Sequence, residues 1–400
     1  MAKRHVEIGI LFSRSGNYHL LSEACRAGAM LAIATVNADK DAAVEFEPVE
    51  RDPEGQIDRY APLCEEITRG GARHVVGCVT SWSRKEVIPV LEKTGATLWY
   101  PCPYEGFEAN EHVVYMHASP NQHLVPLFAH VLPRYGRNAC LVGSNYIWGW
   151  ETNRVARDLV QDAGGQVLAE RYLPLGDTDV SRLVAEIRAV RPSFVLNHLI
   201  GPSSYAFLAA LGELAKQDPA FSPERCPVLS CNLTEIELPA IGPASEGLVA
   251  VGPWFLGAGE PWPWKALEAL EAPEAPEAAG SVAVPAQPSS FFVAAFSSVL
   301  VLADLLGAKE RGAEEGGTTE GPRPGTAPLA FAGRSFSTPF GEIAIDPQTQ
   351  HASLPVRIGR VSGGRFAIVE ASQGRVDPDP YLSRYDPAKV FGRPALRAVS

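Results

Sequence analysis

Features that would assign a function class at once are missing from this 400-residue sequence. Basic residues do not exceed acidic ones, since 35 Lys and Arg against 46 Asp and Glu give a formal net charge of -11. Sequence-independent nucleic-acid binding relies on a basic surface, so direct nucleic-acid binding is excluded. No uninterrupted apolar run approaches the ~20 residues of a membrane span, and we expect no such span. The motifs Gly-x-Ser-x-Gly, Gly-x-x-x-x-Gly-Lys-Ser/Thr and His-Glu-x-x-His are absent, which argues against the enzymes they mark.

The seven cysteines and nine histidines show no metal-binding pattern. No Cys-x-x-Cys pair occurs, and an odd, scattered set of cysteines does not indicate a disulfide framework. We therefore expect no metal and no cofactor. The first apolar stretch, Val6–Phe12, is interrupted by Glu7 and followed by the polar segment Ser13–Gly16, which indicates a strand rather than a secretory signal. The expectation is a cytoplasmic protein, or a periplasmic one if the start codon is misassigned.

Short apolar runs alternate with amphipathic stretches over most of the chain. The runs expected to be strands are Val6–Phe12, Val44–Val49, His74–Val79, Ala96–Tyr100, Ala139–Gly143, Val167–Tyr172, Phe194–His198, Pro227–Cys231 and Leu248–Val251. Helical patterns cover Leu20–Asn37, Tyr60–Arg69, Arg84–Lys93, Leu124–Tyr135, Asn153–Ala163, Ser181–Val190 and Tyr205–Lys216. This alternation predicts parallel sheets covered by helices, the α/β class.

The strands are too many for one comfortable doubly wound sheet, so we expect two Rossmann-like lobes. Lobe 1 is predicted to comprise residues 1–118 and 252–333, and lobe 2 residues 119–251 and 334–376. Residues 377–400 are expected to form an extended tail, because the segment from Val376 is rich in proline.

The last third of the chain differs in character. Ser290–Leu306 is strongly apolar and is predicted to be a buried core helix. Glu271–Ser289 and Glu310–Thr326 are rich in Pro, Glu, Ala or Gly and are expected to be exposed loops. Three strands are expected after them, with Ser362-Gly363-Gly364 as a hairpin turn; they are Gly341–Ile345, Val356–Val361 and Phe366–Val369.

Ligands of open α/β sheets sit beyond the carboxyl ends of the strands. The loops at those positions hold hydroxyls, amides and aromatic rings but few paired ionisable groups; they include Ser81, Tyr100, Tyr146, Trp148, His198 and Asn232. Such loops suit capture of a small molecule better than acid–base catalysis. Ser81 or Ser83 is expected to be the N-cap of a helix, either as a plain cap or beside amides that hold a ligand oxygen. His198 could touch a ligand or be a satisfied core histidine, and Thr234–Glu237 resembles a capping box.

A rigid, aromatic loop, Tyr100-Pro101-Cys102-Pro103-Tyr104-Glu105-Gly106-Phe107, could form a ligand wall or a structural crossover. Together with Val76-Gly77-Cys78, Ser81 and Gly143-Ser144-x-Tyr146-Ile147 it resembles the amide-sensing negative regulators of aliphatic amidase operons, within the type I periplasmic-binding-protein superfamily. The resemblance extends through Pro120-Asn121-Gln122, Glu151-x-Asn153 and Pro378-Asp379-Pro380-Tyr381.

The resemblance implies two lobes joined by hinge crossovers, with a ligand cleft between them. It implies that Ser81, Tyr100, Pro103 and Tyr146 line the pocket. Val79, Cys102 and Trp148 stand where those regulators carry two tyrosines and a threonine. Loss of two hydroxyls, each worth about 0.5–1.5 kcal/mol, favours another amide, a urea-like compound or a nitrile-derived one over acetamide.

Three functions follow from these observations. The first is a cytoplasmic sensor of a short amide or urea-like molecule that controls a partner, in those regulators an RNA-binding antiterminator. The second is the solute-binding receptor of an ABC importer for amides, urea or branched-chain amino acids, for which Glu235 could meet an ammonium group. An amide-hydrolysing enzyme is the third, and we expect no enzyme activity. Homo-oligomerisation is left open.

Overall fold

The computed structural model describes residues 3–257, 288–314 and 330–392, and these divide into two compact units. The first unit comprises Met1–Cys102, Ala109–His117 and Leu256–Leu354, and the second comprises Pro103–Glu108, Ala118–Phe255 and Pro355–Ser400. Residues 334–354, which the sequence assigned to the second lobe, are grouped with the first unit. The reason is that strand β11 (Phe336–Thr338), paired with β12 (Gly341–Ile343), packs on helix α10 (Ser290–Glu314) of that unit.

The first unit is built on a parallel sheet of five strands in the order β2-β1-β3-β4-β5. The strands are β1 (Arg4–Leu11), β2 (Val44–Arg51), β3 (His74–Gly77), β4 (Thr97–Tyr100) and β5 (Val113–Tyr115). The helices besides α10 are α1 (His19–Ala38), α2 (Tyr60–Gly70) and α3 (Ser81–Thr94). Order β2-β1-β3 puts a switch point at β1 and β3, so the loops after these strands open beside each other.

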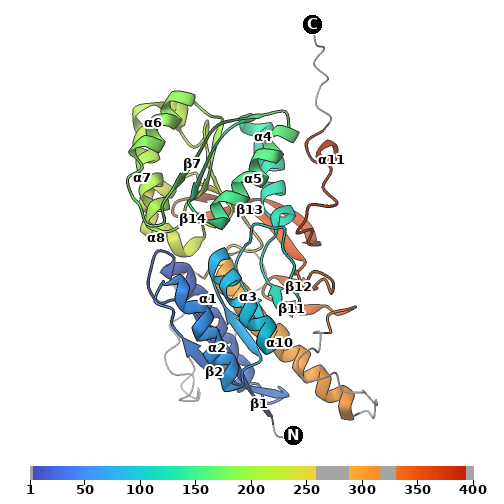
Figure 1. Cartoon of the computed structure of the whole chain (residues 1–400). Coiled ribbons are helices and arrows are strands. Elements are labelled where there is room, and N and C mark those ends of the chain that lie inside the picture. The colour runs from blue at the N-terminus through green and yellow to red at the C-terminus, as the bar shows by residue number, and fades with distance from the viewer. Residues whose placement is uncertain (1–2, 258–287, 315–329, 393–400) are drawn as a thin grey trace. The chain divides into compact units, whose positions relative to one another are not determined.

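Helix α10 packs along α1 at very short range (Figure 1). Gly28 of α1 allows this approach, because a Cβ there would lie 2.2 Å from the carbonyl oxygen of Phe292. Residues Ser290–Ala308 are long and apolar enough to cross a membrane by length and composition, and they are mostly buried. The expectation that no apolar run reaches that length is therefore wrong, whereas the predicted burial of this helix is confirmed.

The second unit holds a seven-stranded sheet in the order β14-β13-β10-β9-β8-β6-β7. Its strands are β6 (Asn138–Ser144), β7 (Gln166–Leu173), β8 (Phe194–His198), β9 (Val228–Ser230), β10 (Val249–Gly252), β13 (Leu354–Ser362) and β14 (Arg365–Val376). The pairs among β6 to β10 are parallel, and β13 joins β10 antiparallel. Gly363 and Gly364 connect β13 to β14 with positive φ angles of 59° and 75°, which confirms the predicted hairpin turn.

The helices of the second unit follow its parallel strands. They are α4 (Leu124–Tyr135), α5 (Ile147–Asp162), α6 (Ser181–Val190), α7 (Pro202–Gln217), α8 (Leu238–Ile241) and α11 (Pro387–Phe391), with short 3-10 turns η2 (Pro120–Gln122), η3 (Pro219–Phe221), η4 (Glu235–Glu237) and η5 (Gly242–Ser245). A core of aliphatic and aromatic side chains, among them Val142, Ile187 and Phe207, lies against α6 and α7. The two parallel-sheet units confirm the predicted α/β class.

Several elements differ from the expectation. Helix α5 begins at Ile147 rather than Asn153, so that Trp148 is helical. The strands β5 and β11, each three residues long, were not expected from the sequence. The tail is not wholly extended: Asp379 accepts hydrogen bonds from the backbone of Ser383 and Arg384, and α11 follows. The expected loops Glu271–Ser289 and Glu310–Thr326 lie largely outside the described residues, but residues 310–314 belong to α10 and are helical.

Candidate functional site

In the first unit, four of the sequence-predicted site residues follow β3 and β4. Val79 and Ser81 lie after β3, and Tyr100 and Cys102 lie at the end of β4; all four are buried. The Tyr100 hydroxyl donates to the carbonyl oxygen of Val79 at 2.9 Å. This bond ties the two loops together, so the structure brings these four residues to one end of the sheet.

The helix after β3 is capped by Thr80, not by Ser81 or Ser83 as expected. The Thr80 side chain accepts from the Ser83 amide at 3.1 Å, and Ser83 Oγ lies 3.1 Å from the Thr80 amide, which completes a capping box. The prediction failed because Thr80 has the extended backbone of an N-cap, with φ -93° and ψ 155°. Ser81 is therefore the first helical residue and is not needed as a cap.

Thiols and one arginine surround this end of the first sheet. Cys25 Sγ and Cys102 Sγ lie 3.9 Å apart, and the Cys102 thiol donates to the carbonyl oxygen of Cys78 at 3.6 Å. Burial raises the pKa values of the Cys78 and Cys102 thiols well above the usual range, so both are neutral. Arg84 is fully buried, with its guanidinium carbon 4.9 Å from the centre of the Tyr100 ring.

In the second unit, Tyr146 and Trp148 follow the carboxyl end of β6. Tyr146 is the N-cap residue of α5 and Trp148 lies in its first turn, and both are buried. The turn is tight because Gly149 passes close to β6, where a Cβ would meet the carbonyl oxygen of Ser144 at 2.1 Å. The indole Nε1 of Trp148 is buried without a hydrogen-bond partner. Pro103 is buried in the segment that enters this unit.

His198 ends β8 beside β6, in register with Gly143. Its ring lies edge-on to Trp148 with the ring centroids 5.5 Å apart. Its Nδ1 lies 2.9 Å from Asn153 Oδ1, while its buried Nε2 has no partner. Burial lowers the pKa of His198 to about 3, so the ring is neutral. From the sequence, His198 could be either a ligand contact or a core histidine with its hydrogen bonds satisfied. In the structure, one of its two ring nitrogens has a hydrogen-bond partner.

His123, which sequence reasoning missed, is the contrasting case. Its Nε2 donates to the Tyr104 carbonyl oxygen at 3.0 Å, and its Nδ1 accepts from the Leu124 amide at 2.8 Å. Burial lowers its pKa to about 4. His123 packs 6.0 Å from Trp148, centroid to centroid. It is a fully satisfied neutral core residue that supports Trp148 from the other side.

The loop after β9 adds an amide and two buried carboxyl groups. Asn232 Oδ1 lies 3.3 Å from Ser230 Oγ, whereas its buried Nδ2 has no partner. Glu235 and Glu237 are both buried. Glu237 accepts from the Tyr205 hydroxyl at 3.1 Å and from the Thr234 amide at 3.3 Å, and burial raises its pKa to about 8. The amide contact is one half of the predicted capping box.

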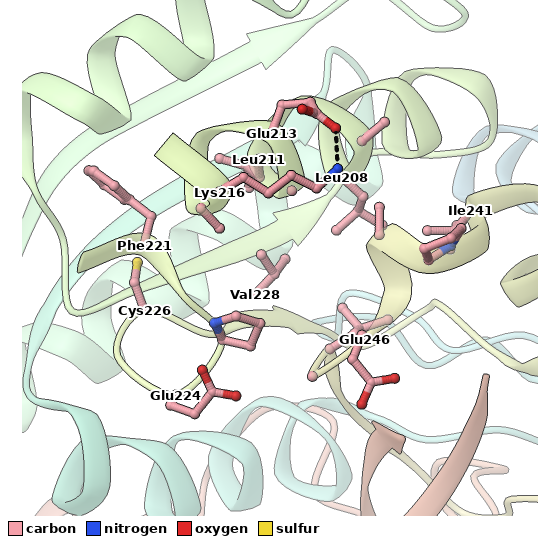
Figure 2. Close-up of a pocket in the computed structure, with 18 residues that line it drawn as sticks. Leu208, Leu211, Glu213, Lys216, Phe221, Glu224, Cys226, Val228, Ile241 and Glu246 are labelled. Atoms are coloured by element: carbon pink, nitrogen blue, oxygen red, sulfur yellow. Dashed lines mark hydrogen bonds and ion pairs between the residues drawn. The ribbon is translucent and has the colours of Figure 1, made fainter. Parts of the chain in front are cut away.

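A cavity of about 490 Å³ lies elsewhere in the second unit (Figure 2). It is bordered by α7, by Val228 at the start of β9 and by Leu248 just before β10. The amino ends of those strands are at the edge of the sheet opposite to the candidate residues. Most of its lining is apolar, and at its border Lys216 pairs with Glu213 at 2.6 Å. No sequence-predicted site residue lines it.

The described residues hold no group of three or more His, Cys, Asp or Glu side chains that could bind a metal ion. What the two sheet ends present is a set of buried, mostly uncharged polar atoms. These atoms can form hydrogen bonds to a small molecule.

The comparisons with known proteins agree with this description. The profile of a family described as "Periplasmic binding protein domain" matches residues 6–387, nearly the whole chain. The chain belongs to the periplasmic binding protein family. Its members are binding proteins with two lobes built on parallel sheets, which confirms the predicted fold class and the superfamily part of the resemblance.

Several solved structures share the fold of the chain at low identity. A solute-binding protein of an ABC transporter from Rhodopseudomonas palustris HaA2, in complex with p-hydroxybenzoic acid, has a TM-score of 0.75 and 20% identity over 93% of this chain and 98% of that one. An amino acid ABC transporter substrate-binding protein from Pseudomonas fluorescens Pf-5 has a TM-score of 0.72 and 18% identity over 95% and 98%. A leucine-binding protein from Thermotoga maritima has a TM-score of 0.69 and 17% identity over 92% and 98%.

Proposed function

We propose that this periplasmic binding protein family member is the solute-binding receptor of an ABC importer. The observation that carries the proposal is the presence of buried polar atoms without protein partners at the carboxyl ends of β6, β8 and β9: Trp148 Nε1, His198 Nε2 and Asn232 Nδ2. A buried polar group left unpaired costs about 1–3 kcal/mol, and a ligand that hydrogen-bonds to it would remove that cost. The solved relatives of this fold are receptors of the same class.

The proposed ligand-contacting residues of the first unit are Val79, Ser81, Tyr100 and Cys102. Those of the second unit are Pro103, Tyr146, Trp148, His198 and Asn232. Each lies at or just after the carboxyl end of a strand. A thermal-shift screen of short amides, ureas, alcohols, amino acids and benzoates, followed by calorimetry, tests binding. Saturable binding of one class supports the proposal, and a screen in which nothing binds overturns it.

A second candidate is the cytoplasmic amide sensor that controls an antiterminator protein. The specific loop Tyr100-Pro101-Cys102-Pro103-Tyr104-Glu105-Gly106-Phe107 favours it. Cell fractionation with sequencing of the mature N-terminus separates the two: an exported, trimmed chain supports the receptor, and a chain retained in the cytoplasm supports the sensor. Under either function, ammonia release from acetamide or urea is expected to stay at the uncatalysed rate.

A further inference from the structure

The cavity of about 490 Å³ in the second unit is a space that the proposed function does not use (Figure 2). Its volume lies within the range of about 300–1,000 Å³ that small-molecule pockets occupy. It lies at the amino ends of β9 and β10, whereas the proposed ligand-contacting residues lie at the carboxyl ends of the strands. A molecule bound here would be a second ligand, so the inference goes beyond the proposed function.

Helix α7 forms one wall of the cavity with a single face. Leu208, Leu211, Gly212 and Ala215 line the cavity, and their spacing of three and four residues places them on the same side of the helix. A Cβ at Gly212 would lie 3.5 Å from the Cβ of Ala244, which lines the opposite wall. The small residues at positions 212 and 215 leave room between the walls that larger side chains would fill.

The inner surface of the cavity is apolar and continuous with the hydrophobic core. Leu211, Phe221 and Cys226 belong to the core cluster that packs against α6 and α7, and Ile241 and Leu248 are also buried. Hydrocarbon gains free energy when it leaves water for such a surface. The inner surface therefore suits the hydrocarbon part of a ligand.

The rim of the cavity is charged and mostly acidic. The four charged lining residues are all exposed; they are Glu213, Lys216, Glu224 and Glu246. Three carboxylates against one ammonium group give the rim a net charge of -2. The ammonium group of Lys216 is already paired, since it lies 2.6 Å from Glu213 (Figure 2). Arg360, 3.5 Å from Glu224, offsets one of the remaining negative charges, and the rim stays acidic.

We propose that this cavity binds a small amphiphilic amine, with its hydrocarbon body against Leu211, Phe221 and Cys226 and its ammonium group at the acidic rim. A carboxylate with the same hydrocarbon body would bring a negative charge to Glu224 and Glu246, which repel it. An alcohol of the same length carries no charge and is expected to bind with intermediate affinity. Because the rim is exposed, salt screens these differences.

Calorimetry with two matched sets of probes tests the ligand class. One set is octylamine, octanol and octanoate, and the other is phenylbutylamine, phenylbutanol and phenylbutyrate. At about pH 7.5 and low ionic strength, we expect at least one amine to bind saturably, about three-fold more tightly than its alcohol and about ten-fold more tightly than its carboxylate. The preference should shrink as salt is added. A carboxylate that binds as tightly as its amine, or the failure of both amines to bind, overturns the inference.

Two substitutions locate the binding of the better amine. Ala215→Phe fills the cavity from α7, and we expect affinity to fall about ten-fold or more. The matched control is Ala185→Phe, since Ala185 is exposed on α6 and does not line the cavity; its affinity should equal that of the wild type. Unchanged affinity in Ala215→Phe refutes the placement. Compounds that bind the proposed solute site should bind Ala215→Phe normally, so the failure of one site is distinguishable from the failure of the other.

The role of the rim charge is tested by Glu246→Gln. Glu246 accepts a hydrogen bond from the Gly363 amide at 2.9 Å, and the side-chain oxygen of glutamine can accept the same bond. We expect affinity for the amine to fall about three-fold while affinity for the matching alcohol is kept. A variant that loses affinity for both probes equally, or for neither, contradicts recognition of the ammonium group by the rim.

Alkylation of two thiols, resolved by peptide mass spectrometry, reports occupation of the cavity in the wild-type chain. Cys226 lines the cavity, whereas Cys140 belongs to the same core cluster but does not line it. Burial raises the pKa of each thiol to about 12, so access through the cavity is what distinguishes them. We expect iodoacetamide to alkylate Cys226 faster than Cys140, and the better amine to slow the reaction of Cys226 selectively. Equal rates at the two thiols, or an amine that does not protect Cys226 over Cys140, rules out the proposed site.

Discussion

The contact between α1 and α10 allows a substitution to be worked out in advance. In Gly28→Ala, the new Cβ would lie 2.2 Å from the Phe292 carbonyl oxygen and 2.9 Å from its carbonyl carbon. Carbon–oxygen contacts between packed elements are normally about 3.3–3.6 Å, so the helices must separate by about 1 Å. The atoms that oppose the methyl group are backbone atoms of α10, which cannot rotate away as a side chain would.

Overpacking of this kind costs about 1–3 kcal/mol, and the better helix propensity of Ala returns about 0.5–1 kcal/mol. We expect Gly28→Ala to lose about 1–2 kcal/mol in urea unfolding, which corresponds to a fall of about 2–8 °C in the Tm of a unit of this size. Gly70→Ala is the matched control, because no atom lies within 4 Å of its Cβ position at the end of α2. It should be neutral or slightly stabilising. A Gly28→Ala variant as stable as Gly70→Ala would refute the close packing.

Three further predictions concern the sheet ends. Burial raises the pKa of the Glu237 carboxyl group from 4.5 to about 8, so the unfolded chain ionises before the folded one and stability falls as the pH rises between these values. Glu237→Gln should therefore flatten the fall in Tm between about pH 5 and 8. An unchanged slope of Tm against pH would contradict this. Thr80→Ala removes a cap and should cost about 0.5–2 kcal/mol of stability with ligand affinity kept, whereas Ser81→Ala should weaken binding by about 1–3 kcal/mol; calorimetry that finds the loss of affinity in Thr80→Ala and not in Ser81→Ala would exchange their roles. Gly149→Ala, with its Cβ 2.1 Å from the Ser144 oxygen, should lower Tm and ligand affinity together, and a variant that binds normally would show that the α5 turn does not position Trp148.

The alternation of apolar and amphipathic segments predicted most of the strands and helices, because parallel strands buried on both faces are continuous apolar runs. Phe194–His198 and Leu124–Tyr135 coincide with the observed β8 and α4. The predicted starts of two helices, α3 and α5, were wrong. Thr80 rather than Ser81 caps α3, since any of three neighbouring hydroxyl residues could do so. The start of α5 was missed because Trp148, Gly149 and Trp150 do not form an amphipathic pattern.

The candidate site could be predicted only to the level of loops. Parallel strands must end on one edge, so the residues that follow them were found by position alone. Arg84 and Asn153 appear in the sequence as members of amphipathic helices, and nothing in their spacing indicates that both are fully buried. Their burial depends on how the helices rotate against the sheet, which the sequence pattern defines only to within about a turn.

The two buried histidines show why sequence alone stops short of ligand chemistry. His123 and His198 each stand singly at the border of an element, and burial holds both neutral, with pKa values of about 4 and about 3. Their environments differ in one respect, the number of ring nitrogens that the protein satisfies: both in His123, one in His198. A buried neutral ring with both nitrogens paired has no capacity left for a ligand, whereas one with a bare lone pair loses stability until a donor arrives. Hydrogen-bond accounting, and not burial or pKa, therefore separates His123, whose two ring nitrogens are both paired, from His198, which has one unpaired ring nitrogen.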